Sequence, residues 1–337
     1  HKPLLPAFTG FGRLVSRIML PMVAVLAIIM APSYLASGAN EYYYGAGHMF
    51  AADTEVCRDT QAIEEVFGQS DTYVLLVPAG DTATQSQLSA ALHALPQVTG
   101  ILSYVDTAGA EIPPGYLDDA TLSQLVSNGT TRMVLSVAAD FEGDAAFALV
   151  EQVRAIAQQD CPDSWYLAGQ GVSTYDLMDT ITGDMAMVNY VAIAAVFLVL
   201  LILERSLILP IVLVLCIETA IWFNLALPYF TGTVVFYIAY LIISSVQLGA
   251  TVDYAILFSD RYREYRQTLD KKPAIVATVA TVTTSVLTPG SGLAVVGFLM
   301  GAISSNQLLA QLGNFLGVGS LASLTIVLLA LPGILYL

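Results

Sequence analysis

Six long apolar stretches constrain the fold of this chain more than any other feature of its sequence. Each approaches the ~20 residues that a helix needs to cross the ~30 Å hydrocarbon core of a bilayer. Because hydrocarbon offers the backbone no hydrogen-bond partners, only helices and closed barrels can span it. The sequence therefore predicts a polytopic α-helical membrane protein with six spans, at residues 18–36, 185–203, 207–225, 241–260, 284–303 and 315–336.

Charged residues are segregated along the chain, and this segregation predicts how it is oriented. Between Ser37 and Asp184 there are 21 acidic and 3 basic residues, although only 12% of the chain is charged. The other basic residues lie beside apolar stretches, a pattern that marks the cytoplasmic side. We therefore expect a multi-pass plasma-membrane protein with cytoplasmic termini and an extracellular or periplasmic acidic segment. An acidic exterior also argues against nucleic acid as a partner, because phosphate binding requires Lys and Arg.

The long acidic segment separates the first apolar stretch from the other five. The predicted layout is a cytoplasmic lead at 1–17, a first span at 18–36, an external domain at 37–184 and a five-span bundle at 185–337. Within the bundle we expect a separate interfacial helix at 274–281. We also expect the next span to be interrupted at Pro289-Gly290, because proline lacks a backbone donor.

The external segment shows alternating strand and helix patterns. Strands are predicted at 72–78, 98–105, 132–138 and 165–168, and helices at 86–95 and 145–158, the second capped by Asp144. This β-α-β-β-α-β order predicts an α+β ferredoxin-like fold. An insertion at 106–130 ends in Asn128-Gly129, which is a turn signal.

The three cysteines fall into two groups. Cys216 lies in a predicted span, whereas Cys57 and Cys161 lie in the external segment, where a disulfide is permitted. Nothing in the sequence shows that these two are close, so paired and free states both remain open.

An acid in the fourth apolar stretch is the main candidate for function. The basic cluster that begins at Arg261 marks a membrane edge, and Asp253 lies about 12 Å inside that edge. A carboxylate at such depth costs several kcal/mol unless it faces protein, water or a partner, so it is a functional-site hypothesis by default. The plainer alternative is a structural hydrogen bond between helices. Protonation would remove the charge and could change how the spans pack.

The neighbours of Asp253 suggest how its helix is used. Ser245, Gly249 and Asp253 are four residues apart and therefore share one helical face. That face is small and polar, and Gly249 in particular would let another helix pack closely. Tyr254 lies about 100° round the helix and is expected to face a different neighbour. A tyrosine that only packs is the alternative interpretation.

A second intramembrane acid, Glu218, carries the same cost in hydrocarbon. With Ser245, Gln247, Thr283 and Thr284 it forms a possible secondary polar site along a water path. Each of these polar residues could instead form an ordinary hydrogen bond between helices.

Several catalytic motifs are absent from the sequence. It contains no phosphate-binding G-x-x-x-x-G-K-[ST] loop, no H-E-x-x-H, no C-x-x-C and no G-x-S-x-G. Its three histidines are scattered, so no metal site is predicted. We therefore expect no ATPase or hydrolase activity and no cofactor.

The layout and motifs together resemble one half of an RND-superfamily transporter of the MMPL branch. The residues that carry the resemblance are Gly249, Asp253 and Tyr254, then Arg261-Tyr262-Arg263-Glu264, and Trp165-Tyr166-Leu167-Ala168-Gly169 ahead of the second span. The chain has Thr251 where the family usually has a second glycine. The basic lead, with Asn40 and Tyr42-Tyr43-Tyr44-Gly45, is similar to the C-terminal half of firmicute-type members.

This resemblance implies a function. The chain would be half of an exporter of lipids or other hydrophobic molecules, driven by the proton-motive force, with an external porter domain. Asp253 and Tyr254 would form the proton relay, and the partner would be the other transporter half, in the same polypeptide or a second chain. The alternative is a non-transporting membrane scaffold, or a lipid or sterol sensor, on the same fold.

Overall fold

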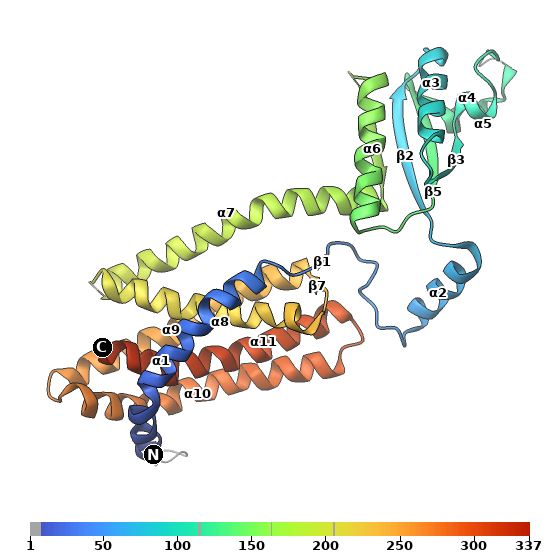
Figure 1. Ribbon diagram of the computed structural model, residues 1–337. Coiled ribbons are helices and arrows are strands. Elements are labelled where there is room, and N and C mark those ends of the chain that lie inside the picture. The colour runs from blue at the N-terminus through green and yellow to red at the C-terminus, as the bar shows by residue number, and fades with distance from the viewer. Residues whose placement is uncertain (1–7, 114–115, 163, 205) are drawn as a thin grey trace. The chain divides into compact units, whose positions relative to one another are not determined.

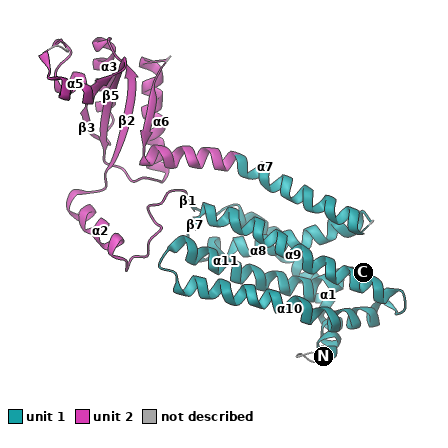
Figure 2. Ribbon diagram, turned by 180° about the vertical axis from the view of Figure 1, so that it is seen from behind, with its two compact units in different colours: residues 1–43, 184–337 teal, residues 44–183 magenta. Residues whose placement is uncertain are grey.

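A computed structural model of the protein describes residues 8–113, 116–162, 164–204 and 206–337. The chain divides into two compact units, shown in different colours in Figure 2. The helical unit comprises residues 1–43 and 184–337, and the α+β unit comprises residues 44–183. A short parallel strand pair lies within the helical unit, between β1 (Tyr42–Tyr43) and β7 (Val235–Phe236).

Six helices within the described ranges are long and apolar enough to cross a membrane, which confirms the prediction of a polytopic helical protein. Figure 1 shows these helices. The last of the six changes from α-helix to π-helix and back along its length. The spans are α1 (Thr9–Ser37), α7 (Gln170–Glu204), α8 (Ile208–Thr231), α9 (Tyr237–Arg266), α10 (Lys271–Ile303), and the sixth helix formed by α11 (Gln307–Thr325), η2 (Ile326–Ala330) and α12 (Leu331–Tyr336).

Several helices extend beyond the apolar stretches from which the spans were predicted. Helix α1 begins at Thr9 and so includes part of the expected lead at 1–17, whose first seven residues lie outside the described ranges. Helix α10 is continuous from Lys271, so the separate interfacial helix at 274–281 is wrong. It also continues through Pro289 without interruption. Beside that proline, the Ser320 hydroxyl of α11 donates to the Gly290 carbonyl at 2.8 Å and so joins the two helices.

Close backbone contact holds α10 against α11. A Cβ added at Gly297 would lie 2.6 Å from both the Gly313 carbonyl oxygen and the Gly317 nitrogen. Backbone atoms cannot move aside as a flexible side chain can. The absence of side chains at these positions therefore allows the two helices to approach more closely than larger residues would permit.

The α+β unit contains the predicted ferredoxin-like fold. Its main strands are ordered β3-β5-β2-β6, and each neighbouring pair is antiparallel. The elements are β2 (Asp71–Pro78), α3 (Thr82–His93), β3 (Val98–Leu102), β5 (Thr130–Val137), α6 (Asp144–Asp160) and β6 (Tyr166–Gly169). This is the β-α-β-β-α-β order expected from the sequence.

One hydrophobic core lies between this sheet and its helices. Alternate residues of β2, among them Tyr73 and Leu75, are fully buried, as the two-residue period of a strand predicts. Leu88 of α3 and Leu149 of α6 belong to the same core, so both helices cover one face of the sheet.

The α+β unit contains further elements outside this core. They are α2 (Glu55–Phe67), α4 (Tyr104–Thr107), α5 (Asp119–Leu125) and β4 (Val126–Ser127). Helix α4 ends the predicted strand at 98–105 early, since the Ser103 side chain caps it. Asn128 and Gly129 form the predicted turn between β4 and β5, with φ of 49° and 75°.

Two features of the α+β unit bear on the sequence predictions, the N-cap of α6 and the state of its two cysteines. Gly143, with φ of 101°, occupies the N-cap of α6, so Asp144 is the first helical residue and not the cap. As an acid in the first turn, Asp144 still interacts favourably with the helix dipole. Cys57 and Cys161 are both free thiols.

The start of α7 is fixed to the sheet of the α+β unit. The buried Asp71 carboxylate of β2 accepts a hydrogen bond of 2.7 Å from the Gly171 backbone N–H, in the first turn of α7. A Cβ at Gly171 would lie 2.8 Å from that carboxylate, so glycine allows the contact. Burial, and secondarily the charge of Asp71, raises the pKa of the neighbouring Tyr73 to about 12, and its phenol stays protonated at neutral pH.

The far end of α7 is fixed to α9. The Glu204 side chain is only 1% exposed, and it forms an ion pair with Arg263. It also accepts a 2.6 Å hydrogen bond from the Ser259 hydroxyl. Most other side chains along α7 are exposed in this chain, so this cluster is a principal attachment of the helix to the rest of the helical unit.

Replacing Glu204 should destabilise the helical unit. Glu204→Gln can still accept from Ser259 but loses the ion pair with Arg263, which should cost about 1–3 kcal/mol. Thermal unfolding in detergent would measure this loss. Glu264→Gln is the matched control, because Glu264 forms an ion pair with Arg261 on the exposed surface of α9. An exposed ion pair contributes about 0–1 kcal/mol to stability. Equal melting temperatures for the two variants would therefore contradict the role of Glu204 in attaching α7 to α9.

Candidate functional site

Helix α9 presents one exposed face and one buried face. Ser245, Gly249 and Asp253 are all exposed, and their four-residue spacing places them on one side of the helix. Ile242 and Val246 on the same side are 43% and 44% exposed. We call the exposed side of α9 formed by these five residues the Asp253 face.

Asp253 lies near the middle of its span. It is 16 residues from Tyr237 and 13 residues from Arg266, the two ends of α9. At a rise of about 1.5 Å per residue these separations are roughly 24 and 20 Å. Its carboxylate forms no ion pair or hydrogen bond with any residue in the described ranges. An ionised carboxylate so placed costs about 2.5–3.5 kcal/mol by insertion measurements, so it requires cover or protonation.

Gly249 packs against no other described span of this chain. A Cβ added at Gly249 would meet no atom within 4 Å. The space beside it is therefore open in this chain, and no described helix fills it. Larger residues would be expected on a surface that faces only lipid, whereas small and polar residues are typical of helix interfaces.

The neighbouring helix α10 also exposes small and polar residues. Thr281, Ser285, Thr288 and Gly292 are exposed at helical spacing. Thr281 lies beside α9, since its hydroxyl is 3.0 Å from that of Tyr265. By contrast, α1 exposes large apolar residues, such as Ile28 at 72%. The exposed surface of the helical unit is thus chemically uneven.

Tyr254 points into the helical unit. It is 9% exposed, in contrast to the adjacent Asp253. It lines a cavity of about 10 Å³ together with Gln247 and Thr251 of its own helix and Ser320 and Ser323 of α11. This volume is near the minimum that holds one water molecule. The 100° offset between the two residues therefore separates them as expected, and the neighbour of Tyr254 belongs to this chain.

A buried hydrogen-bond network joins α8, α9 and α11 beside this cavity. The Asn224 side-chain amide donates to the Gln247 side-chain oxygen at 2.9 Å and to the Phe315 carbonyl at 2.9 Å. Gln247 in turn donates to the Gly319 carbonyl at 3.2 Å and to the Ser323 hydroxyl at 3.3 Å. The Thr251 hydroxyl lies 2.8 Å from the Ser323 hydroxyl. These residues form what we call the Gln247 network.

Glu218 lies at the same depth as Asp253. The Asn224–Gln247 hydrogen bond fixes the register of two antiparallel helices, and each acid is six residues from its end of that bond, toward the same end of the bundle. The two carboxyls are therefore at one level, about 9 Å from the bond. Glu218 is 5% exposed, and it has no hydrogen-bond partner in the described part of the chain. One acid thus faces inward and the other outward.

The remaining predicted residues do not gather into one site. The Thr283 hydroxyl donates to the Val279 carbonyl of its own helix at 2.6 Å. Thr284 is partly buried, and its carbonyl accepts from Thr288. Ser245 is exposed, so Gln247 is the member of the secondary polar set that enters the buried network. Within the described ranges, no group of His, Cys, Asp or Glu side chains is placed to hold a metal ion.

Sequence analysis missed the contribution of α11. Gly319, Ser320 and Ser323 lie on one side of that helix and receive or make contacts with α9 and α10. Their i, i+1, i+4 spacing could have indicated a polar stripe. In a span, however, small residues usually indicate only close packing.

These features define a class: a multi-pass helical membrane protein with a ferredoxin-like domain and an acid in the middle of a span. The profile of the MMPL family matches residues 48–337, and the chain belongs to that family. A protein of Streptomyces coelicolor, named as a membrane protein, is 28% identical to it over 298 residues, or 81% of this chain. The chain spans 38% of the length of that relative.

The Gln247 network should contribute measurably to stability. Gln247→Leu removes the amide that bridges α8 and α11 and leaves the Asn224 side chain with fewer partners. The expected loss is about 1–2 kcal/mol, since buried polar groups in spans are costly to leave unpaired. Thermal unfolding in detergent measures it, with the exposed neighbour substitution Val246→Leu as control. A double-mutant cycle with Ser323→Ala should show coupling, and strict additivity would contradict the network.

Proposed function

We propose that this chain is half of a proton-driven exporter of lipids or other hydrophobic molecules, of the RND type. Asp253 would bind and release the transported proton. The single observation that carries this proposal is the exposed, unpaired carboxylate of Asp253 near the middle of a span. Such a group is tolerated where a second set of spans or a water path covers it.

The surroundings of Asp253 support a protein partner. The open space at Gly249 and the polar residues exposed on α10 would be unusual on a lipid-facing surface. A second transporter half, in the same polypeptide or another chain, would cover the Asp253 face. This chain covers 38% of the length of the Streptomyces coelicolor relative, which leaves room for a second half in that relative.

The proposed coupling follows from the charge of Asp253. When ionised, it favours a polar or hydrated interface between the halves, and when protonated it tolerates an apolar one. The proton gradient would then bias two packings of the same spans. One charge crossing the membrane supplies about 2.3 kcal/mol per 100 mV. Since the Gln247 network ties α9 to α8 and α11, a shift of α9 would move these helices together.

Tyr254 would have an accessory role in this scheme. Its side chain lines the small cavity with Thr251 and Ser323, beside the Gln247 network. We propose that its hydroxyl, and a water molecule in the cavity, stabilise the arrangement in which Asp253 exchanges its proton.

Substituting Asp253 tests the proposal directly. The full-length protein in proteoliposomes, under an imposed pH gradient, would be assayed with Nile red as hydrophobic cargo and pyranine as the internal pH probe. Asp253→Asn keeps size and hydrogen bonding but cannot titrate, so both fluxes should fall to the level of protein-free vesicles. Tyr254→Phe and Glu218→Gln should cause milder losses.

The control for this experiment is Asp260→Asn. Asp260 is also exposed and lies seven residues further along α9, near the basic cluster, so its substitution should leave both fluxes near normal. Near-normal proton flux in Asp253→Asn at matched protein level would overturn the relay. It would leave the scaffold or sensor interpretation ahead.

Filling the space at Gly249 should disrupt assembly and spare the fold. Gly249→Leu places a side chain where this chain has no atom within 4 Å, so its melting temperature should not fall, and helix propensity favours leucine. Transport should be lost because the second half could no longer approach. Gly183→Leu is the matched control, since Gly183 of α7 is exposed with equally open space. Full transport by Gly249→Leu would argue against a helix packed there.

A further inference from the structure

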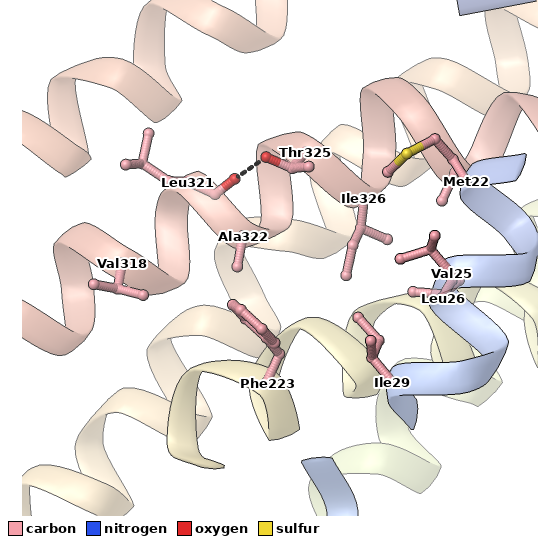
Figure 3. Close-up of a pocket in the computed structure, with 11 residues that line it drawn as sticks. Met22, Val25, Leu26, Ile29, Phe223, Val318, Leu321, Ala322, Thr325 and Ile326 are labelled. Carbon is pink, nitrogen blue, oxygen red and sulfur yellow. Dashed lines mark hydrogen bonds between the residues drawn. The ribbon is translucent and has the colours of Figure 1, made fainter. Parts of the chain in front are cut away.

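An apolar cavity of about 450 Å³ lies within the helical unit, away from the Asp253 face. Figure 3 shows it between α1, α8 and the last helix. Neither α9 nor α10 contributes a lining residue. Side chains that line it include Met22, Val25 and Ile29 of α1, Phe223 of α8, Ala322 of α11 and Ile326 of η2. Its volume is within the range of about 300–1,000 Å³ that is typical of ligand pockets.

The lining offers no free polar side chain. Thr325 is its polar member, and the Thr325 hydroxyl donates to the Leu321 carbonyl at 2.8 Å, drawn as a dashed line in Figure 3. A bound headgroup, sugar or peptide would bring polar groups that find no side-chain partner here. The chemistry of the cavity therefore selects a purely hydrocarbon occupant.

The wall of the cavity includes a rare backbone form. The π-helix η2 contributes Ile326 and Ala330 to the lining. Segments of π-helix are uncommon and occur frequently at functional sites. The hydrogen bonds of a π-helix join residues five apart, so the side chains on this wall are spaced differently from those of the α-helix on either side.

The size of the cavity favours a single chain over a whole helix as occupant. A helix about 10 Å wide that crosses ~30 Å of hydrocarbon fills roughly 2,400 Å³, about five times the space present. An empty cavity would leave its lining atoms without dispersion contacts on one side. We propose that this cavity binds one acyl chain of a membrane lipid.

Binding at this site would depend on shape. Transfer from lipid tails to an apolar cavity gains nothing from the hydrophobic effect, so packing against the lining must supply the preference. The Leu26 side chain, which also lines the cavity, is 9% exposed, and Ala330 is 1% exposed, so the inner part of the site is enclosed by protein. The inference is independent of proton coupling, because it involves no residue of the Asp253 face.

Photo-crosslinking in the full-length protein identifies the occupant. Phe223→p-benzoylphenylalanine places a benzophenone in the cavity, where it takes up part of the volume. On irradiation in vesicles of phosphatidylethanolamine and phosphatidylglycerol, its ketone oxygen takes a hydrogen from a neighbouring C–H and a carbon–carbon bond forms. Mass spectrometry should show a phospholipid adduct. The control is the same substitution at Ile28, which is 72% exposed on α1 and is not a lining residue.

Filling the cavity should separate site binding from contact with bulk lipid. Ala322→Phe should reduce lipid capture at position 223 about tenfold, a preference of about 1.4 kcal/mol, and leave capture at position 28 unchanged. Val25→Phe, from the exposed helix α1, should act in the same direction if Ala322→Phe folds poorly. Adducts with peptide masses at position 223, or lipid capture that both fillers leave unchanged, would overturn the proposal.

Discussion

The side chain of Gln247 satisfies a constraint on which the helical unit depends. Hydrocarbon provides no donors or acceptors, so a polar side chain inside a span must find its partners in the protein. Gln247 finds them on two other helices, α8 and α11, and thereby fixes the register of α9 against both. The depth of every other residue on α9, including Asp253, follows from that register.

The same constraint divides the polar groups of the spans into those that have partners in the protein and those that have none. Glu204 has an ion pair and a hydrogen bond, and it attaches α7 to α9. Thr283 satisfies its hydroxyl within its own helix. Asp253 and Glu218 have no partner among the described residues. Groups that the protein satisfies explain how the bundle is held together, and groups that it leaves unsatisfied are the candidates for the proposed proton binding and contact with a partner.

The fold was largely predictable from the sequence because its signals are local. Apolar length identified the six spans, and the order of strand and helix patterns identified the ferredoxin-like topology. Boundaries were less accurate, since α10 continues through Pro289 although proline lacks a backbone donor. The common face of Ser245, Gly249 and Asp253 followed from their four-residue spacing, whereas its exposure in this chain did not. The Gln247 network did not follow, because Ser323 lies 76 residues away along the chain, and no local pattern indicates which helices become neighbours.

The two attachments of α7 have an evolutionary consequence. Asp71 fixes its first turn within the α+β unit, and Glu204 fixes its last turn within the helical unit. Between them the helix is continuous for 35 residues. One residue inserted between β6 and Gly171 would move the Gly171 N–H away from Asp71, and one inserted between the buried Leu200 and Glu204 would turn the Glu204 side chain by about 100° away from Ser259. Homologues should therefore keep the chain length at both ends of α7 and vary in length in the loops of the α+β unit.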